Sequence, residues 1–355
     1  MTAAFAIAGR RIGGGAPCFV IAEAGVNHNG DADKARALVD AAAAAGADAV
    51  KFQTFDPEAL AAADAPRAAY QKAAGNTGEA GQLEMLRALV LPRGLHSELQ
   101  RRAERLGILF LSSPFDDGSA DFLASIGVPA MKIPSGELTN LPFIEHLAAK
   151  GVPLLMSTGM ATLDEVRAAV ASARRVPAAP PVGLFHCVSS YPARAEDANL
   201  RAMATLRDTF RVPVGWSDHT PGLDITVAAV ALGAELIEKH LTLDRTLPGP
   251  DHKASLDPGQ MTELIAAVRR VSAALGDGVK RPVEAEREIA RVARKSLYFA
   301  TDLPAGATVR REHLVALRPG TGISPARMGE VCGRVLPDAV HAGQMVPDRL
   351  LESTS

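Results

Sequence analysis

Short apolar segments alternate with amphipathic segments along most of this chain. The apolar segments have the length of β-strands, and the segments between them show the residue spacing of helices. Strands that alternate with helices are typical of parallel βαβ units. The pattern predicts strands at residues 18–24, 49–55, 108–114, 130–135, 153–158, 182–189, 212–219 and 235–241. It predicts helices at residues 32–45, 93–106, 119–126, 142–149, 163–175, 200–209, 223–232 and 258–275.

Eight such units within about 260 residues match the size of a (β/α)8 TIM barrel. A doubly wound sheet is the alternative, but no Gly-rich phosphate-binding turn follows the first strand. We therefore predict a TIM barrel over residues 1–276, which begins with a small hairpin at residues 5–12. Residues 277–293 are charged and lack a strong apolar period, so they are predicted to be a linker. Residues 294–355, rich in short strands and turns, form a second, β-rich domain in this prediction.

The amino-acid composition of the chain argues against several classes of function. The chain has 38 Lys and Arg residues and 40 Asp and Glu residues, a net charge of −2, which argues against nucleic acid or a membrane surface as a partner. Its three cysteines are far apart and odd in number, so no disulfide framework is expected. The short apolar run at residues 3–8 precedes Arg10 and Arg11, the reverse of the order in a signal peptide. We expect a cytoplasmic enzyme.

In a TIM barrel the chemistry lies at the carboxyl ends of the strands, and every predicted strand here ends in polar or ionisable residues. Together these ends would form one polar basin. Rims of barrels are generally polar, so a single such end would mean little. The residues at the strand ends include Glu23, Lys51, Gln53, Lys132, Ser135, Glu137, Ser157, Ser189, Ser217, His219, Glu238 and His240.

Two histidines suggest a metal site in this basin. Ser217 and His219 lie two residues apart at one strand end, as do Glu238 and His240 at the next, so each pair shares a face of its strand. Two inward histidines with a carboxylate nearby fit a divalent metal that polarises a carbonyl group. The alternative is that each histidine is an ordinary, half-buried residue whose hydrogen bonds are satisfied.

The other half of the basin has the groups that an anion requires. Lys51 and Lys132 lie in apolar strands, where an unpaired ammonium group would be costly. Together with the serine hydroxyls they could hold a phosphate or carboxylate. The alternative is that they form buried ion pairs with Glu23 and Glu137.

Seven segments of the chain resemble segments of the sialic acid synthases, and they occur in the same order as in that family. This family condenses phosphoenolpyruvate with an N-acylated hexosamine to a nine-carbon 2-keto-3-deoxy acid. Residues 294–350 resemble the antifreeze-like SAF domain that follows the barrel in this family. The segments in the barrel are IAEAGVNHNG at 21–30, VKFQT at 50–54, KIPSGE at 132–137, STGM at 157–160, HCVSSYP at 186–192, SDHT at 217–220 and GPDHKAS at 249–255.

The resemblance implies roles for these residues. His219 and His240 would bind a divalent metal, with Mn²⁺ expected and Mg²⁺ or Co²⁺ as alternatives. Glu23, as base, would join Lys51, Lys132 and Glu238 in catalysis. Some family members have Asn where Ser189 stands, which makes Ser189 the weakest of the anion contacts. Phosphoenolpyruvate would contact Lys51, Lys132, Ser135, Ser157, Ser189 and Ser217, while Gln53 and Glu137 order the substrates and Tyr191, Asp251 and Arg318 contact the sugar.

The same resemblance implies a homodimer in which the SAF domain of one subunit places Arg318 over the barrel of the other. N-acetylmannosamine, which gives N-acetylneuraminic acid, is the expected sugar. The alternatives are 2,4-diacetamido-2,4,6-trideoxymannose, which gives N,N'-diacetyllegionaminic acid, and an altrose analogue, which gives pseudaminic acid. Outside the family, a Schiff-base aldolase would use Lys132 as its nucleophile, and an antifreeze-type binding protein would use the C-terminal domain alone.

Overall fold

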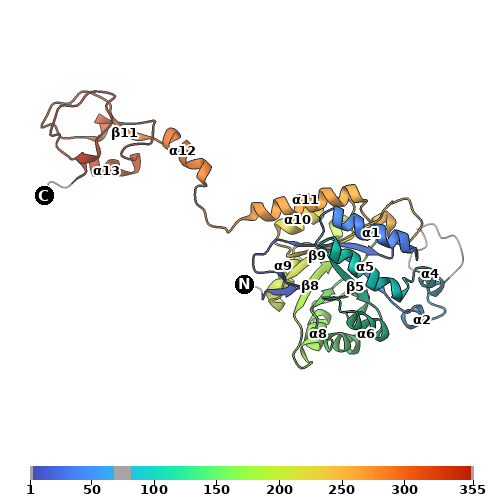
Figure 1. Ribbon diagram of the computed structural model, residues 1–355. Helices are drawn as coiled ribbons and strands as arrows, with labels where there is room; N and C mark the ends of the chain where they lie inside the picture. The colour runs from blue at the N-terminus through green and yellow to red at the C-terminus, as the bar shows by residue number, and fades with distance from the viewer. Residues whose placement is uncertain (1–2, 68–80, 353–355) are drawn as a thin grey trace. The chain divides into compact units, whose positions relative to one another are not determined.

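The computed structural model describes residues 3–67 and 81–352, in two compact units, Met1–Gly276 and Asp277–Ser355. The first unit is a closed barrel of parallel strands with helices around it (Figure 1). The strands follow one another around the barrel in chain order, and the last one pairs with the first. This confirms the predicted TIM barrel. The strands are β3 (Phe19–Gly25), β4 (Ala49–Thr54), β5 (Leu109–Pro114), β6 (Met131–Ile133), β7 (Leu154–Ser157), β8 (Val182–Cys187), β9 (Val214–Asp218) and β10 (Leu236–His240).

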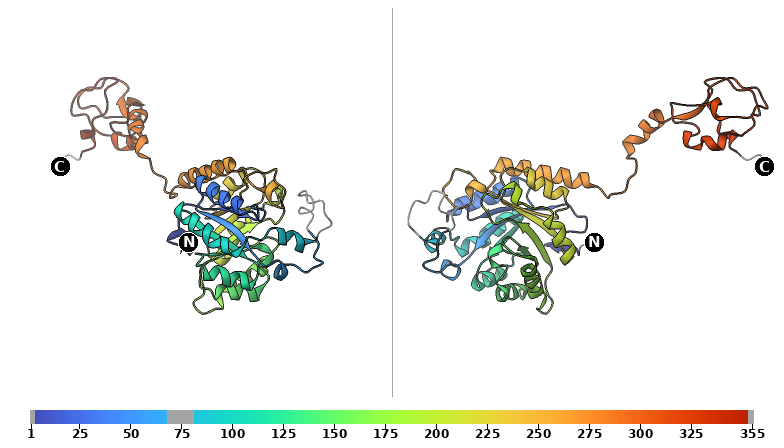
Figure 2. Two further views of the ribbon diagram at one scale, coloured as in Figure 1. Left: turned by 45° about the vertical axis from the view of Figure 1, so that its right-hand side comes forward. Right: turned by 180° about the vertical axis from the view of Figure 1, so that it is seen from behind.

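A helix follows each strand and covers the outside of the barrel (Figure 2). The short helices α2 (Pro57–Leu60) and α4 (Gln82–Ala88) were not predicted, because neither is long enough to show two turns of apolar periodicity. Within residues 3–67 and 81–352, every helix is too short or too polar to span a lipid bilayer. The outer helices are α1 (Ala32–Ala44), α5 (Arg93–Arg105), α6 (Asp117–Ser125), α7 (Leu141–Ala148), α8 (Leu163–Arg174), α9 (Ala202–Phe210), α10 (Asp224–Ala231) and α11 (Pro258–Leu275).

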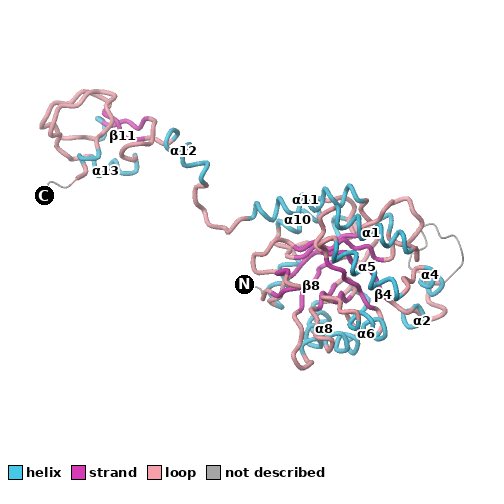
Figure 3. Tube along the Cα trace, viewed as in Figure 1, coloured by secondary structure: helices cyan, strands magenta, loops and turns pink. Residues whose placement is uncertain are grey.

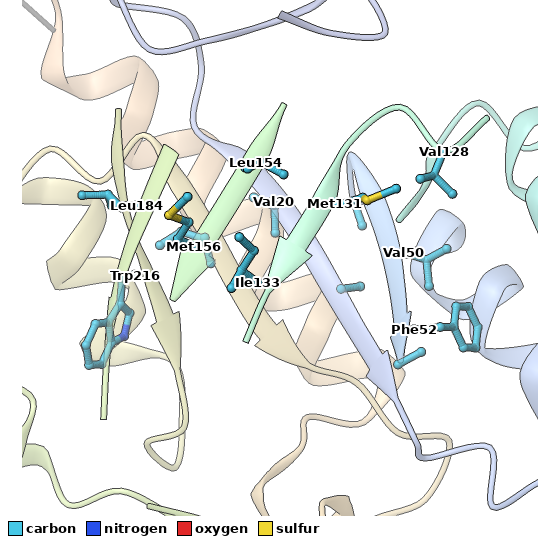
Figure 4. Close-up of a cluster of buried hydrophobic side chains, with 14 of the residues drawn as sticks. Val20, Val50, Phe52, Val128, Met131, Ile133, Leu154, Met156, Leu184 and Trp216 are labelled. Carbon is cyan, nitrogen blue, oxygen red and sulfur yellow. The ribbon is translucent and has the colours of Figure 1, made fainter. Parts of the chain in front are cut away.

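Two layers of apolar side chains form the core of the barrel unit. Outward-facing side chains of the strands, among them Met156, Leu184 and Trp216, pack beneath the helices (Figure 4). A second cluster fills the interior, and the predicted hairpin, β1 (Phe5–Ile7) and β2 (Arg10–Ile12), adds two isoleucines to it. Because the interior is apolar at the amino ends of the strands, inward polar side chains are confined to the carboxyl ends. The interior cluster comprises Ile7, Ile12, Phe19, Ile21, Ala49, Leu111, Ala130, Leu155, Phe185 and Leu236.

The second unit has its own small core and is mostly loop, with few regular elements (Figure 3). Strands β11 (Ser296–Phe299) and β12 (Leu314–Leu317) pair antiparallel, and α13 (Met328–Val331) packs with them. The predicted β-rich C-terminal domain is therefore present. Its buried core includes Leu297, Phe299, Val309, Leu314, Val331, Leu336 and Val346.

One helix in this region was not predicted. The segment expected to be a linker without apolar periodicity contains α12 (Glu284–Ala293). Ile289 and Val292 lie three residues apart on this helix, and the ion pairs Arg287–Glu284 and Arg291–Glu288 link successive turns. The high density of charged residues concealed a short amphipathic helix.

Candidate active site

The carboxyl ends of the barrel strands, here called the mouth, hold a cluster of buried polar side chains. Along β3, Phe19 and Ile21 fill the interior, and Glu23, at the next inward position, belongs to the mouth. The same alternation brings inward polar residues of other strands together. Those buried to 5 % exposure or less are Glu23, Lys51, Ser113, Lys132, Ser157, Ser217, His219 and Glu238.

Lys51 is held by two carboxylates and a hydroxyl. Its Nζ lies 2.8 Å from Glu23 Oε2 and 3.6 Å from Glu238 Oε2, and it donates a 2.8 Å hydrogen bond to Ser113 Oγ. The Lys51–Glu23 ion pair, foreseen as an alternative to anion binding, is therefore present.

Lys132 does not form the ion pair that the alternative interpretation expected. Its Nζ donates to Ser157 Oγ at 2.6 Å and lies 3.6 Å from Glu238 Oε1, across the barrel interior. Glu137 instead belongs to a turn beyond β6 and accepts a hydrogen bond from Asn140 before α7. An inward lysine on a strand meets the inward residues of other strands, not a residue of the loop that follows it. Glu238 thus lies between both lysines.

Burial and charge separate the pKa values of the two carboxyl groups. Burial alone would raise the pKa of Glu238, but the ammonium groups of Lys132 and Lys51 outweigh it and lower that pKa to about 2. At Glu23 burial prevails over the attraction of Lys51, and its pKa rises to about 7. The pKa of Lys51 is raised, since Glu23 and Glu238 together outweigh its burial. Burial lowers the pKa of Lys132. When both lysines are protonated, two ammonium groups around the firmly ionised Glu238 give this half of the mouth a surplus of positive charge near neutral pH.

Further hydroxyl groups surround Gly159, in the loop after β7. Ser135 Oγ accepts a 3.0 Å hydrogen bond from Gly159 N–H and lies 3.2 Å from Cys187 Sγ. A Cβ on Gly159 would lie 2.2 Å from Ser189 Oγ and 2.8 Å from Ser135 Oγ. Only glycine leaves room for both serines to approach this backbone. Ser217 contributes differently, since its hydroxyl donates to Glu238 Oε1 at 2.8 Å.

The two predicted metal ligands lie side by side at the other half of the mouth, their ring centroids 5.4 Å apart. Burial lowers the pKa of His219, and burial together with His219 lowers that of His240 well below its ordinary value, so both rings are neutral at pH 7. His219 Nδ1 is 2.7 Å from the carbonyl oxygen of Val188, to which it donates. Its Nε2 then carries the lone pair that a metal requires.

The fit to a metal rests on a buried atom without a partner. His240 Nδ1 has no hydrogen-bond partner within the described ranges, and Asp251 Oδ2 lies 3.9 Å from it, beyond bonding distance. Two neutral imidazoles with available lone pairs fit Mn²⁺ or a similar ion. Across residues 3–67 and 81–352, no set of three His, Cys, Asp or Glu side chains is placed to hold a metal. Substrate oxygens or water would have to complete the coordination.

The remaining predicted substrate contacts divide into those at the mouth and one in the second unit. The ring centroids of Tyr191 and His219 are 4.1 Å apart, and Gln53 Nε2 is 3.5 Å from Glu23 Oε1. Burial raises the pKa of Asp251 to about 6. Arg318 lies in the second unit with an exposed side chain.

Two residues at the mouth received no role in the sequence-based site. Ser113 holds Lys51, and Cys187 touches Ser135. Alternation could have identified both, because Leu111 and Phe185, two residues before them, fill the interior.

Comparison with known proteins agrees with this geometry. Residues 38–280 match the NeuB family, and residues 294–352 match the SAF domain. The chain belongs to the NeuB family. It is 47% identical over 335 residues to N,N'-diacetyllegionaminic acid synthase of Legionella pneumophila, a match that covers 92% of each chain. The synthase of the same name from Campylobacter jejuni is 42% identical, over 89% of this chain and 95% of the relative.

The fold is also that of a solved structure. The N-acetylneuraminic acid (sialic acid) synthetase of Leptospira borgpetersenii, crystallised with citrate, superimposes with a TM-score of 0.72. The two are 36% identical, and the match covers 81% of this chain and 95% of that one. The resemblance to sialic acid synthases is thereby confirmed at the level of the family.

The separated pKa values predict opposite effects of two similar substitutions on stability. Glu238 has a pKa below its ordinary value, so its ionised form stabilises the fold at neutral pH, and Glu238→Gln should lower the free energy of unfolding at pH 8 by about 3–5 kcal/mol. Glu23 has a raised pKa, so its stability contribution is lost as pH rises from its ordinary pKa of 4.5 to about 7, and Glu23→Gln should be neutral or stabilising at pH 8.

Urea denaturation at pH 8 and pH 6 measures both effects. At pH 6 the folded state keeps the Glu23 proton that the unfolded chain, with its ordinary pKa near 4.5, has released, so the gain from Glu23→Gln should be smaller than at pH 8 and should vanish only below about pH 4.5. Equal losses of stability in the two variants at pH 8 would contradict the assignment.

Proposed function

We propose that this protein condenses phosphoenolpyruvate with 2,4-diacetamido-2,4,6-trideoxymannose to give N,N'-diacetyllegionaminic acid and phosphate. The choice of sugar rests on the relatives, since two legionaminic acid synthases are 47% and 42% identical, whereas the N-acetylneuraminic acid synthetase is 36% identical. N-acetylmannosamine, favoured from the sequence, becomes the second candidate. The family and the mouth of the barrel support the reaction type for either sugar.

The positive half of the mouth suits phosphoenolpyruvate. Lys51 and Lys132 are buried and share Glu238, so one of their two charges is not balanced by that carboxylate. In a site with little water, fixed ammonium groups bind the phosphate and carboxylate strongly. The hydroxyls of Ser135, Ser157 and Ser189 supply further donors. These groups would hold the ligand with its reactive carbon towards His219 and His240.

The chemistry divides between the two halves. A divalent metal held by His219 and His240, Mn²⁺ in this proposal, would polarise the C1 aldehyde of the open-chain sugar. The C2=C3 π electrons of phosphoenolpyruvate form the bond from C3 to that aldehyde carbon, and the aldehyde oxygen keeps its C=O π pair and takes up a proton. Water adds to the cation left at C2 and gives up a proton. The C–O bond to phosphate at C2 then breaks, the electron pair leaves with phosphate, and the C2 hydroxyl loses its proton to become the keto group. With a pKa of about 7, Glu23 can take the proton from the attacking water.

Lys132 also supports a second mechanism, because burial lowers its pKa and so favours the nucleophilic free amine. In a Schiff-base aldolase this amine would attack a carbonyl carbon. Its contacts with Ser157 and Glu238 favour a fixed ammonium group instead.

The test supplies purified protein with phosphoenolpyruvate, Mn²⁺ and one sugar at a time, and measures phosphate release and the keto acid. We expect kcat/KM for the diacetamido sugar to exceed that for N-acetylmannosamine by at least about tenfold, since its extra acetamido group adds contacts of about 1.4 kcal/mol or more. A preference for N-acetylmannosamine would overturn the choice of sugar. Turnover without metal, with a borohydride-trapped lysine adduct, would favour the aldolase.

We also propose that two copies share their sites, with Arg318 of one subunit serving the mouth of the other. The exposed apolar side chains of α12 support association, since Ile289 and Val292 are 63% and 61% exposed. A two-fold axis would make the exchange mutual. The guanidinium group of Arg318 would contact the sugar or its acyl group.

Mixing two inactive variants tests the shared site. His219→Ala subunits and Arg318→Ala subunits, each with little activity alone, should regain activity when exchanged. In a heterodimer one site has both residues intact, so up to about a quarter of wild-type activity is expected if dimers form at random. No recovery despite subunit exchange, shown by differently tagged subunits, would contradict the proposal.

A further inference from the structure

A buried ion pair lies on the outer face of the two strands that carry the histidines. Asp218 is the last residue of β9 and directly precedes His219, and Lys239 directly precedes His240 on β10. Lys239 Nζ lies 2.8 Å from Asp218 Oδ2, and both side chains are 0% exposed. Side chains alternate between the two faces of a strand, so this pair faces away from the mouth and cannot touch substrate. The proposed reaction therefore does not use it directly.

Hydrogen bonds from neighbouring groups surround both charged side chains of this pair. Asp218 Oδ1 accepts from the backbone N–H and the hydroxyl of Thr220, both at 2.7 Å, and Oδ2 also accepts from the hydroxyl of Thr226 on α10 at 2.5 Å. Lys239 Nζ makes a second bond, of 2.5 Å, to the carbonyl oxygen of Thr220. Five bonds thus tie β9, the loop after it, α10 and β10 together. Such saturation is needed to offset the cost of burying two charges.

The β9–β10 ladder does not reach His219, whose backbone is held instead by a 2.9 Å hydrogen bond from Ala193 N–H to its carbonyl oxygen. The ladder between β9 and β10 ends with Asp218 opposite Lys239, so His219 lies one residue beyond the last paired position. His240, in contrast, is paired with Glu23 of β3 on its other side. The backbone on either side of His219 is held by Asp218 and Thr220, both of which bond to Lys239.

We propose that Asp218 and Lys239 are a positioning pair that fixes the separation of His219 and His240 for the metal. This inference rests on the metal site of the proposed function. Metal ligands depend on the groups behind them for their orientation, and loss of such groups typically weakens metal binding about 10–100-fold. A pair that only stabilised the barrel would leave metal affinity unchanged in folded protein.

The test measures the Kd for Mn²⁺ alone, by electron paramagnetic resonance of the free ion, without either substrate. The double variant Asp218→Asn/Lys239→Met removes both charges and keeps the size of the side chains. We expect it to be folded and to bind Mn²⁺ about 10–100-fold more weakly than wild type. Wild-type Kd in the folded double variant would overturn the inference.

A matched control alters an ion pair near the other end of the barrel. Arg269 Nη2 lies 2.6 Å from Oδ2 of Asp48, the residue before β4. Asp48→Asn/Arg269→Met should lower Tm and leave the Kd for Mn²⁺ as in wild type. If it weakens Mn²⁺ binding as much as the Asp218/Lys239 variant does, the effect is one of general stability and the inference fails.

Two further variants keep the outcome decisive. Thr226→Val removes only one hydroxyl bond to Asp218, so it should weaken Mn²⁺ binding about two- to tenfold even if the double variant does not fold. An unchanged Kd in Thr226→Val would then overturn the inference. His219→Ala should abolish binding. If wild type does not bind Mn²⁺, or His219→Ala binds it equally well, the proposed metal site itself is wrong, and the inference falls with it.

Discussion

The carboxylate of Glu238 between the ammonium groups of Lys51 and Lys132 is the interaction on which the mouth of the barrel depends. Without it, two buried like charges would repel each other in a medium that screens them poorly. With it, the amino group of each lysine has a carboxylate partner at the end of an otherwise apolar interior. The remaining positive charge is available to an anion. The same field keeps Glu238 ionised, while burial keeps Glu23 near its midpoint of titration at neutral pH.

The architecture could be predicted from the sequence because local pattern determines it. Apolar strands alternate with amphipathic helices, and residue alternation along each strand decides which side chains face inward. The partner of Lys132 could not be predicted in this way. Glu137 is near in sequence, whereas Glu238 is brought close only when β10 pairs with β3 to close the barrel. The α12 helix was missed because its few apolar residues lie among charges.

The two halves of the mouth differ in how they are built. Lys51 and Lys132 lie within strands and take part in the backbone ladders, whereas His219 lies one residue beyond the β9–β10 ladder and is held by a backbone bond from Ala193 and by side-chain bonds. Substitutions behind the histidines should therefore weaken metal binding, and substitutions around Glu238 should weaken anion binding. Relatives of similar sequence or fold bear the names of different products, so the barrel fold alone does not decide the sugar.

The most direct test of this division is the affinity for phosphoenolpyruvate in metal-free protein, measured by calorimetry. Lys132→Met should weaken binding about tenfold to a hundredfold, the cost of one charge-assisted contact. His219→Ala should bind phosphoenolpyruvate as wild type does, because the anion does not need the histidines. If His219→Ala loses phosphoenolpyruvate and Lys132→Met retains it, the division of the mouth into an anion half and a metal half is wrong.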